Sequence, residues 1–167
     1  YKRVTMVKLE QSPRMAIELS LADKEELALI LAEEQRRRVD SPLEFMELLP
    51  IQKLFVSCKA SLVLLCGGNR SGKSTPSAYK IIQSALESKK KIWVCGETFS
   101  DSVAIQQKKI SELVPRQQIK YGSFDDINGY TNRKLLLKNG SLITFKSYDQ
   151  GRETFQSDDI DEIWNDE

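Results

Sequence analysis

The sequence predicts an α/β protein in which a mainly parallel central sheet is flanked by helices. Apolar runs of strand length at residues 62–66 and 92–95 alternate with amphipathic helical segments, an order typical of parallel sheets. A glycine-rich loop at residues 67–75 joins the first run to a helical stripe. Near residues 134–146, apolar runs on both sides of Asn139-Gly140 predict a β-hairpin with a type I′ turn.

The bulk composition describes an ordinary globular chain and excludes a few classes of protein. The 167 residues suffice for a domain with a real core, and 40% of them are hydrophobic. The net charge of +1 gives no global field that would attract a polyanion, although a local basic patch would suffice. No apolar run is long enough for a membrane span and no signal peptide is visible, so we expect no membrane partner. The chain begins at Tyr1 rather than methionine, which is consistent with a fragment.

Cysteine and histidine usage narrows the chemistry further. Cys58, Cys66 and Cys95 show no C-x-x-C spacing, and the last two fall in predicted core strands. We therefore favour reduced core thiols of a cytosolic protein over a metal site. The chain has no histidine, which excludes Ser-His-Asp and Cys-His catalysis and histidine-based zinc sites.

The glycine-rich loop fits the pattern G-x-x-x-x-G-K-[S/T], the phosphate-binding loop (P-loop) of nucleoside triphosphatases. Glycines at its ends allow successive backbone N–H groups to turn toward phosphate oxygens. Lys73 supplies a positive charge for the phosphates, and Ser74 offers a hydroxyl to Mg²⁺. The following helix points its positive end at the same anion, and Pro76 is tolerated in the first turn. The flanking strand and helix favour ATP binding over a chance match. The predicted ATP-binding loop residues are Gly67, Gly68, Asn69, Arg70, Ser71, Gly72, Lys73, Ser74 and Thr75.

Start and stop signals divide the chain into an N-terminal helical extension, residues 1–49, and a P-loop ATPase domain, residues 50–167. Ser20 with Asp23 predicts a helix to about Arg38, and Ser41-Pro42 predicts a short helix to about Leu49.

Three further features belong to the predicted ATPase domain. Ser100 or Asp101 begins a helix that runs to about Val114, and a short strand is expected at residues 118–121. Gln52, upstream of the loop, has the donor and acceptor needed to read an adenine edge, although a surface glutamine is an equal interpretation.

Two acidic pairs compete for the role of Mg²⁺ carboxylate and catalytic base. Asp166-Glu167 follows an apolar run and sits at a plausible strand end, whereas Asp161-Glu162 would begin that strand. Ligands bind at the carboxyl edge of open α/β sheets, so we favour Asp166 as the Mg²⁺ ligand and Glu167 as the base. A solvated acidic tail is the alternative. Arg70 and Arg152 are candidates for stabilising the γ-phosphate, Arg70 by its place inside the loop.

Three segments together carry a resemblance to a known family: the loop, residues 145–153 (Phe-Lys-Ser-Tyr-Asp-Gln-Gly-Arg-Glu) and residues 163–167 (Ile-Trp-Asn-Asp-Glu). In these segments the chain resembles the large terminase subunits of tailed bacteriophages. The resemblance implies an ATP-driven motor that moves double-stranded viral DNA into a procapsid. The implied partners are a portal protein, a small terminase subunit and further copies in a ring, in the cytoplasm of an infected bacterial host. It also implies that Lys73 and Ser74 bind phosphate and Mg²⁺, that Asp166 and Glu167 act on metal and water, and that Arg152 can act on a neighbouring subunit.

Some features depart from the terminase pattern. Asn165 stands where the family usually has an apolar residue, and Ser157 where a glycine is common. The strands after the acidic pair, the coupling motif and the nuclease domain of the family are absent from the sequence. We therefore expect a truncated ATPase domain that does not cut DNA, and whether it hydrolyses ATP unaided stays open. The alternatives are another P-loop nucleic-acid motor, such as a helicase-like ATPase, and an inactive remnant.

Overall fold

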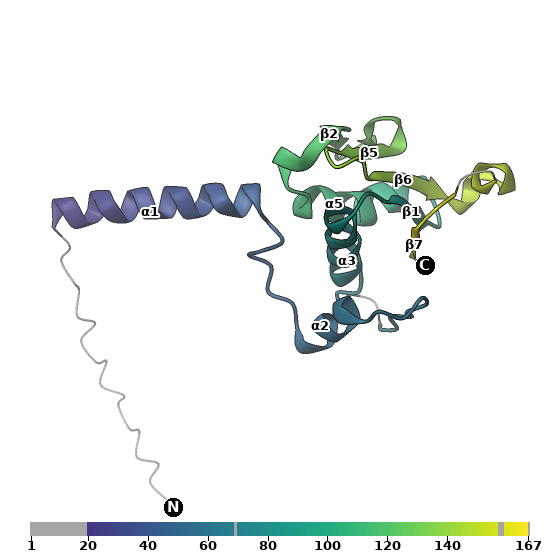
Figure 1. The fold of residues 1–167 in the computed structure, drawn as a ribbon, viewed down its shortest axis with the longest axis horizontal. Helices are drawn as coiled ribbons and strands as arrows, with labels where there is room; N and C mark the ends of the chain where they lie inside the picture. Colours follow the sequence, from purple (N-terminus) through teal and green to yellow (C-terminus); the bar gives the residue numbers. More distant parts are fainter. Residues whose placement is uncertain (1–19, 69, 157–158, 167) are drawn as a thin grey trace, which may run out of the picture. The chain divides into compact units, whose positions relative to one another are not determined.

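The computed structural model describes residues 20–68, 70–156 and 159–166 (Figure 1). The chain divides into two units, Tyr1–Glu34 and Gln35–Glu167, and each is described by itself. Helix α1 (Leu21–Asp40) begins in the first unit and ends in the second.

The start of α1 is fixed by a reciprocal pair of hydrogen bonds. The Asp23 backbone N–H donates to Ser20 Oγ at 3.2 Å, and the Ser20 N–H donates to Asp23 Oδ2 at 3.1 Å. The predicted helix start is therefore confirmed. The expected apolar side is only partly covered, since Leu27, Ile30 and Leu31 are 44%, 56% and 48% exposed.

The second unit is built on a mixed five-stranded sheet with the strand order β2-β5-β6-β1-β7. Strand β1 runs parallel to β6 on one side and to β7 on the other, while β5 is antiparallel to both β2 and β6. The expected α/β class is confirmed. The expectation of a mainly parallel sheet is wrong, because β5 is antiparallel to both of its neighbours and only the two pairs that include β1 are parallel. The strands are β1 (Lys91–Gly96), β2 (Ile119–Tyr121), β5 (Lys134–Leu137), β6 (Leu142–Ser147) and β7 (Glu162–Asn165).

Helices and short turns surround this sheet. A separate hairpin pairs β3 (Phe124–Asp125) with β4 (Gly129–Tyr130). The helices are α2 (Pro50–Ser57), α3 (Ser74–Glu87), α4 (Phe99–Ser102), the π-helix η1 (Val103–Gln107) and α5 (Lys108–Leu113). Short 3₁₀ turns are η2 (Arg116–Gln118), η3 (Thr131–Arg133), η4 (Tyr148–Gln150) and η5 (Arg152–Phe155).

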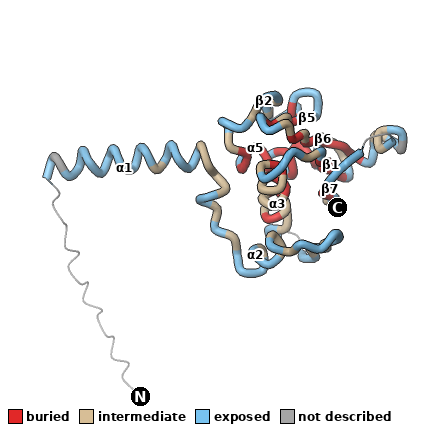
Figure 2. Tube along the Cα trace, viewed as in Figure 1, coloured by how far each residue is buried: buried red, intermediate tan, exposed pale blue. Residues whose placement is uncertain are grey.

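The core lies between one face of the sheet and helices α3 and α5 (Figure 2). Alternate residues of the strands point into it, so Ile92 and Val94 of β1 join Ile143 and Phe145 of β6. Tyr130 stacks on Phe145 with ring centroids 5.0 Å apart, which joins the β3–β4 hairpin to the core. The buried residues of α3 include Ala78, Ile81, Ile82 and Ala85.

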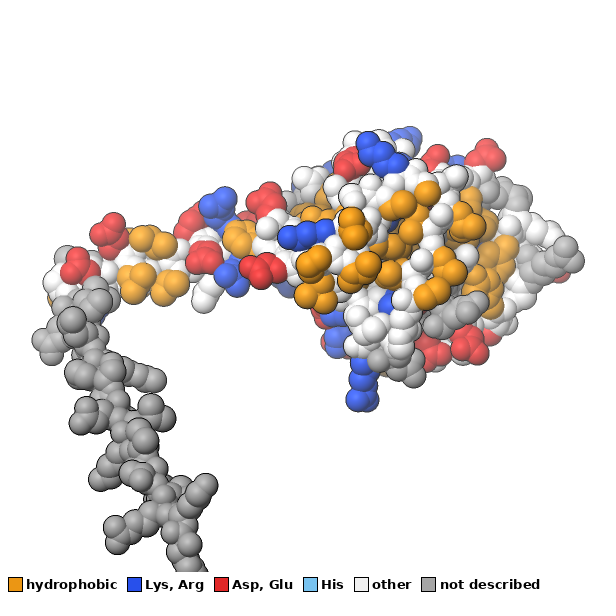
Figure 3. Space-filling view, turned by 90° about the horizontal axis from the view of Figure 1, so that it is seen from below, with side chains coloured by type: hydrophobic (Ala, Val, Ile, Leu, Met, Phe, Trp, Pro, Cys, Tyr) orange, Lys and Arg blue, Asp and Glu red, His pale blue; other side chains and the backbone are white. Residues whose placement is uncertain are grey.

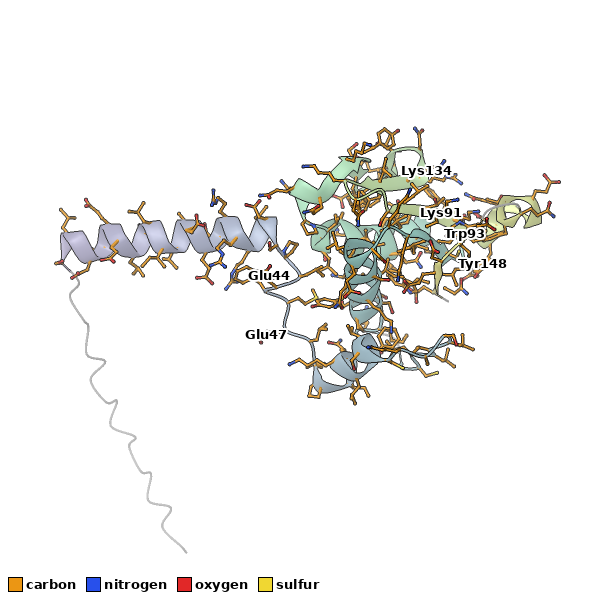
Figure 4. All side chains as sticks on the ribbon, viewed as in Figure 1. Glu44, Glu47, Lys91, Trp93, Lys134 and Tyr148 are labelled. Carbon is orange, nitrogen blue, oxygen red and sulfur yellow. The ribbon has the colours of Figure 1, made fainter. Side chains whose placement is uncertain are left out.

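The opposite face of β1 is covered by the segment that follows β6. Phe155 of η5 meets Trp93 edge-on at 5.8 Å and stacks on Tyr148 at 5.6 Å. Figure 4 shows Trp93 and Tyr148 at the same end of the sheet. The Lys146 ammonium lies 3.4 Å from the Trp93 ring centroid, a cation–π arrangement that suits a buried lysine. Both faces of β1 are therefore packed, which explains its near-continuous burial.

The apolar run at residues 62–66 is not a strand, so that prediction is wrong. Leu62 and Leu64 are 89% and 83% exposed. The run pairs with none of the strands of the described sheet, whose order is β2-β5-β6-β1-β7. The run therefore stays outside the sheet, and Cys66, expected in the core, is exposed while Cys95 is buried. Large apolar side chains gather on one face of the molecule, visible in Figure 3.

The helix expected at residues 41–49 is absent, whereas the helix expected at residues 100–114 is present as the continuous run of α4, η1 and α5. The first is a turn closed by the Glu44 N–H donating to the Ser41 carbonyl at 3.1 Å. Pro50 restricts Leu49 to extended angles, with ψ at 155°, so no helix runs into α2. The second helix begins after Thr98, whose hydroxyl accepts from the Asp101 N–H at 3.2 Å, and its middle is the π-helix η1.

The β5–β6 hairpin is present, but its turn is not type I′. Gly140 has a φ of 90°, and Asn139 is absent from the described non-glycine positions with positive φ, whereas type I′ needs positive φ at both central residues. The Asn139 amide donates to the Ala85 carbonyl at 2.7 Å, and its oxygen accepts from the Ser141 N–H at 2.9 Å. The turn is thus shaped by the asparagine side chain, which binds the end of α3.

Thiol labelling tests the corrected position of residues 62–66. We expect a disulfide exchange reagent to modify Cys66 first and Cys95 last in the folded protein. Cys66 is exposed, whereas burial raises the pKa of the Cys95 thiol to about 11. Mass spectrometry of partially labelled peptides gives the order. Equal protection of Cys66 and Cys95 would instead place the run in a core strand.

Candidate functional site

The phosphate-loop sequence forms a tight turn that leads into α3. Lys73 is the N-cap of α3. Pro76 lies in the first turn of the helix, as the sequence predicts, and is buried. Arg70 and Gly72 have positive φ angles of 61° and 79°, and the Ser71 N–H donates to the Gly68 carbonyl at 3.2 Å. The start of α3 therefore directs its N–H groups toward the loop. Asn69 lies outside the described residues.

The Lys73 side chain lies over the first glycines of the loop. Its ammonium donates to the Gly67 carbonyl at 2.6 Å and to the Gly68 carbonyl at 3.0 Å. An ammonium has donors only, and phosphate oxygens are stronger acceptors for it than neutral carbonyls. Lys73 is thus held over the loop by two backbone carbonyls.

Gln52 contacts the loop from helix α2. Its amide Nε2 donates to the Gly72 carbonyl at 3.2 Å, and its Oε1 accepts from the Leu49 N–H at 2.9 Å. A Cβ on Gly72 would approach the same Nε2 to 3.3 Å, so a glycine at that position keeps this contact unstrained. Gln52 therefore joins α2 to the loop, while its reading of an adenine edge stays a prediction.

Asp166 meets the loop from the far end of the sequence. Ser74 Oγ donates to Asp166 Oδ2 at 3.4 Å, a contact between residues 92 positions apart. The Asp166 N–H donates to the Cys95 carbonyl at 3.0 Å and so continues the β1–β7 ladder past the last strand residue. This places the carboxylate at the carboxyl edge of the sheet beside the start of α3.

The environment of Asp166 disfavours its charged form. Burial raises the pKa of this carboxyl, while the Ser74 hydrogen bond and the Lys73 charge act in the lowering direction without cancelling it. A carboxylate held partly out of water next to a hydroxyl and an ammonium is a suitable oxygen ligand for a hard cation. The donor set therefore fits Mg²⁺ bound together with a phosphate.

The other acidic pair serves the framework. Asp161 Oδ2 accepts from the Lys91 N–H at 2.8 Å, at the amino end of β1. Glu162 Oε2 accepts from Ser84 Oγ at 2.5 Å and pairs with Lys90 at 3.5 Å. Both side chains therefore already have hydrogen-bond partners, and both lie at the opposite end of β7 from Asp166.

Asn165, which departs from the terminase pattern, has a partner in the structure. Its Oδ1 accepts from the Tyr148 hydroxyl at 2.8 Å, and the residue is exposed. The amide therefore carries no penalty for burial without a partner. It joins the end of β7 to η4.

The remaining predicted residues are brought together only in part. Arg70 is exposed beside the loop, and Thr75 is half-buried in the first turn of α3. Glu167 and the Arg152 side chain lie outside the described residues, so their predicted roles stay predictions.

The sequence analysis did not identify Gln106, which contacts the end of β1 next to Asp166. Its Nε2 donates to the Cys95 carbonyl at 3.0 Å, the same oxygen that receives the Asp166 N–H. A signal was present, because Val103, Gln106, Gln107 and Ile110 form a helical stripe in which polar residues occupy core positions. All four are buried in the structure.

The described residues contain no group of three or more histidine, cysteine or acidic side chains placed to hold a metal ion by themselves. A helix with the length and apolarity to cross a membrane is also absent from that part of the chain. Comparison of the chain with protein-family models, with curated proteins and with solved structures found no match.

The raised pKa of Asp166 predicts an unusual gain of stability on substitution. A raised pKa in the folded state means that the stability contributed by the neutral acid is present below its ordinary value of 3.8 and is lost as the pH rises through the raised pKa. Asp166→Asn is neutral at every pH. We therefore expect its free energy of unfolding, from urea titration at pH 7, to exceed that of the parent protein.

Asp125→Asn is the matched control with the opposite sign. The backbone N–H groups of Asn128 and Ile127 lower the pKa of Asp125, so this carboxylate stabilises the fold at neutral pH and that contribution is lost in acid. We expect Asp125→Asn to be less stable than the parent protein at pH 7. A loss of stability in both variants would show that Asp166 is a structural carboxylate.

Proposed function

We propose that the chain binds a magnesium nucleoside triphosphate on the loop at residues 67–75 and serves as the ATPase part of a viral DNA-packaging terminase. The observation that carries the proposal is the contact between Ser74 and Asp166, 3.4 Å from Oγ to Oδ2. It joins the phosphate loop to the acidic end of β7, the two parts that a Mg²⁺-dependent phosphoryl-transfer site requires.

Each described group has a definite part in such a site. Backbone N–H groups of the loop and of the first turn of α3 bind phosphate oxygens. Lys73 exchanges its bonds to the Gly67 and Gly68 carbonyls for the β- and γ-phosphates. Ser74 and Asp166 hold Mg²⁺, which when bound neutralises charge on the phosphates. Gln52, anchored on Gly72, lies where it can border the nucleotide.

The hydrolytic step needs groups that orient water and stabilise the transferred phosphate. Glu167, next to Asp166, is proposed to accept a proton from the attacking water. Arg70, exposed beside the loop, is proposed to contact the γ-phosphate, and Arg152 to act on a neighbouring copy.

The resemblance to large terminases supports the choice of motor. It carries with it proposals of double-stranded DNA as the moved partner, a portal protein and a small terminase subunit as assembly partners, and the cytoplasm of an infected bacterial host as the place of action.

An inactive remnant is a second candidate, and one observation favours it. The run at residues 62–66 leads directly into the loop, yet Leu62 and Leu64 are 89% and 83% exposed. The loop is therefore anchored through α3 and Gln52 rather than through a preceding sheet strand. A loop held on one side is less preorganised for an anion, which reduces affinity.

Substitution of Lys73 tests the nucleotide proposal. We expect Mg-ATP at a hundredfold excess over its Kd to stabilise the parent protein by about 2.7 kcal/mol, and Lys73→Ala to lose this stabilisation. Lys120→Ala, an exposed lysine on β2, is the matched control and keeps it. Thermal unfolding and equilibrium binding of a fluorescent ATP analogue give both values. Binding by Lys73→Ala equal to that of the parent would refute the proposed site, and no binding by the parent would favour the remnant.

A further inference from the structure

Strand register places three exposed lysines on the side of the sheet that faces away from the core. Side chains alternate along β5, so Lys134, Leu136 and Lys138 point outward. Lys91 of β1 lies in the same row as Leu136, because both pair with Leu142 of β6. All three lysines are exposed, and together they are called the lysine face below.

The register also fixes the spacing of these lysines. Lys134 and Lys138 are four residues apart along β5, a distance of about 13 Å between their Cα atoms. Lys91 lies two strands from β5, opposite the midpoint between them, and is therefore about 12 Å from each. Figure 4 shows Lys134, Lys91 and Trp93 following one another along the sheet. Lysine stems are long and flexible, so three ammonium groups at this spacing can contact one extended polyanion.

The positive charge of the lysine face is not neutralised by the sheet. Strands β1, β2, β5 and β6 contain no aspartate or glutamate. None of the three ammonium groups makes a hydrogen bond or ion pair with another residue in the described part of the chain. Asp161, which precedes β7, already accepts the Lys91 backbone N–H at 2.8 Å. A local surplus of positive charge is therefore present although the whole chain has a net charge of only +1.

An exposed aromatic ring borders the same row of the sheet. Tyr121 of β2 pairs with Leu136 and is 45% exposed. Its hydroxyl accepts from Asn132 Nδ2 at 2.7 Å, which restrains the ring. Leu136 and Leu142 are half-buried and form an apolar floor between the ring and Lys91. Bases stack on aromatic rings and ammonium groups pair with phosphates, so this combination suits a nucleic acid.

The open part of this side of the sheet lies away from the phosphate loop. Near the carboxyl end of β1, Trp93 and Lys146 are buried and lie against Phe155 of η5. Lys91 is the first residue of β1, whereas Asp166 lies beside its carboxyl end. A ligand on the lysine face therefore leaves the proposed nucleotide site free.

We propose that the lysine face binds a nucleic acid through its phosphate backbone, with Tyr121 offering a ring on which an unpaired base stacks. This proposal rests on the proposed function only for the expectation that the partner is a nucleic acid. It adds the surface that holds this partner, at the opposite end of β1 from Asp166. Duplex and single-stranded DNA share the phosphate chemistry, and the experiment separates them.

The test measures fluorescence anisotropy of a labelled DNA, as a duplex and as a single strand, with the nucleotide-free chain. We expect saturable binding by the parent protein. Counterion release makes each lysine–phosphate contact worth about five- to eightfold in affinity at about 0.1 M salt, so Lys91→Gln, Lys134→Gln and Lys138→Gln should each weaken binding by that factor. The triple variant should lower the slope of log affinity against log salt by about 2 to 3. Lys53→Gln, which removes an exposed charge from α2, should change neither value.

Tyr121→Ala distinguishes the two forms of DNA. Stacking of one base is worth about 1–3 kcal/mol, so this variant should bind the single strand about fivefold or more weakly and leave duplex binding unchanged. Unchanged affinity for both forms would overturn the part assigned to Tyr121.

The outcomes separate this proposal from the nucleotide proposal. If the parent chain binds Mg-ATP but no DNA, or if the triple variant binds DNA as tightly as the parent, the lysine face is wrong and the nucleotide site stands. Lys73→Ala should lose Mg-ATP and keep DNA. Polyglutamate that competes as strongly as DNA would assign the face to an acidic protein and overturn the proposal. Circular dichroism establishes that each variant is folded.

Discussion

The backbone carbonyl of Cys95 is the atom on which the proposed site depends. It lies at the end of β1 and accepts one hydrogen bond from the Asp166 N–H and another from Gln106 Nε2, both at 3.0 Å. The first bond extends the parallel β1–β7 register by one residue, from Cys95 opposite Asn165 to Asp166. The second joins the π-helix to the same point. Asp166 therefore lies next to Ser74 because β7 pairs with β1 in this register, and not because of a local turn.

The sheet around that atom shows what the sequence can and cannot predict. The run at residues 92–95 became β1, and the asparagine–glycine turn joined two strands, because strand length and turn chemistry are local properties. The run at residues 62–66 is as apolar as β1, yet it lies outside the sheet. Whether an apolar run joins a sheet depends on the tertiary packing around it, and no local pattern carries that information.

The sequence likewise predicted some residues of the candidate site and not others. The loop, Ser74 and the choice of Asp166 over Asp161 followed from motif spacing and from the rule that ligands bind at the carboxyl edge of a sheet. Gln106 did not, since a glutamine within a helical stripe is easily taken for a surface residue. It lies on the π-helix η1 and is buried together with Gln107. The turn at Asn139 was also misjudged, because its side chain binds the carbonyl of Ala85 on α3, far away in sequence.

The central claim is that Ser74 and Asp166 act on the same magnesium ion. A double-mutant cycle on the Mg²⁺-dependent binding of ATP tests it most directly, with Ser74→Ala, Asp166→Asn and the double variant. Groups that share a ligand couple by about 0.5–3 kcal/mol, so we expect the double variant to lose clearly less affinity than the sum of the single losses. Strict additivity would contradict the account, because it would show that the two residues do not meet at one ion.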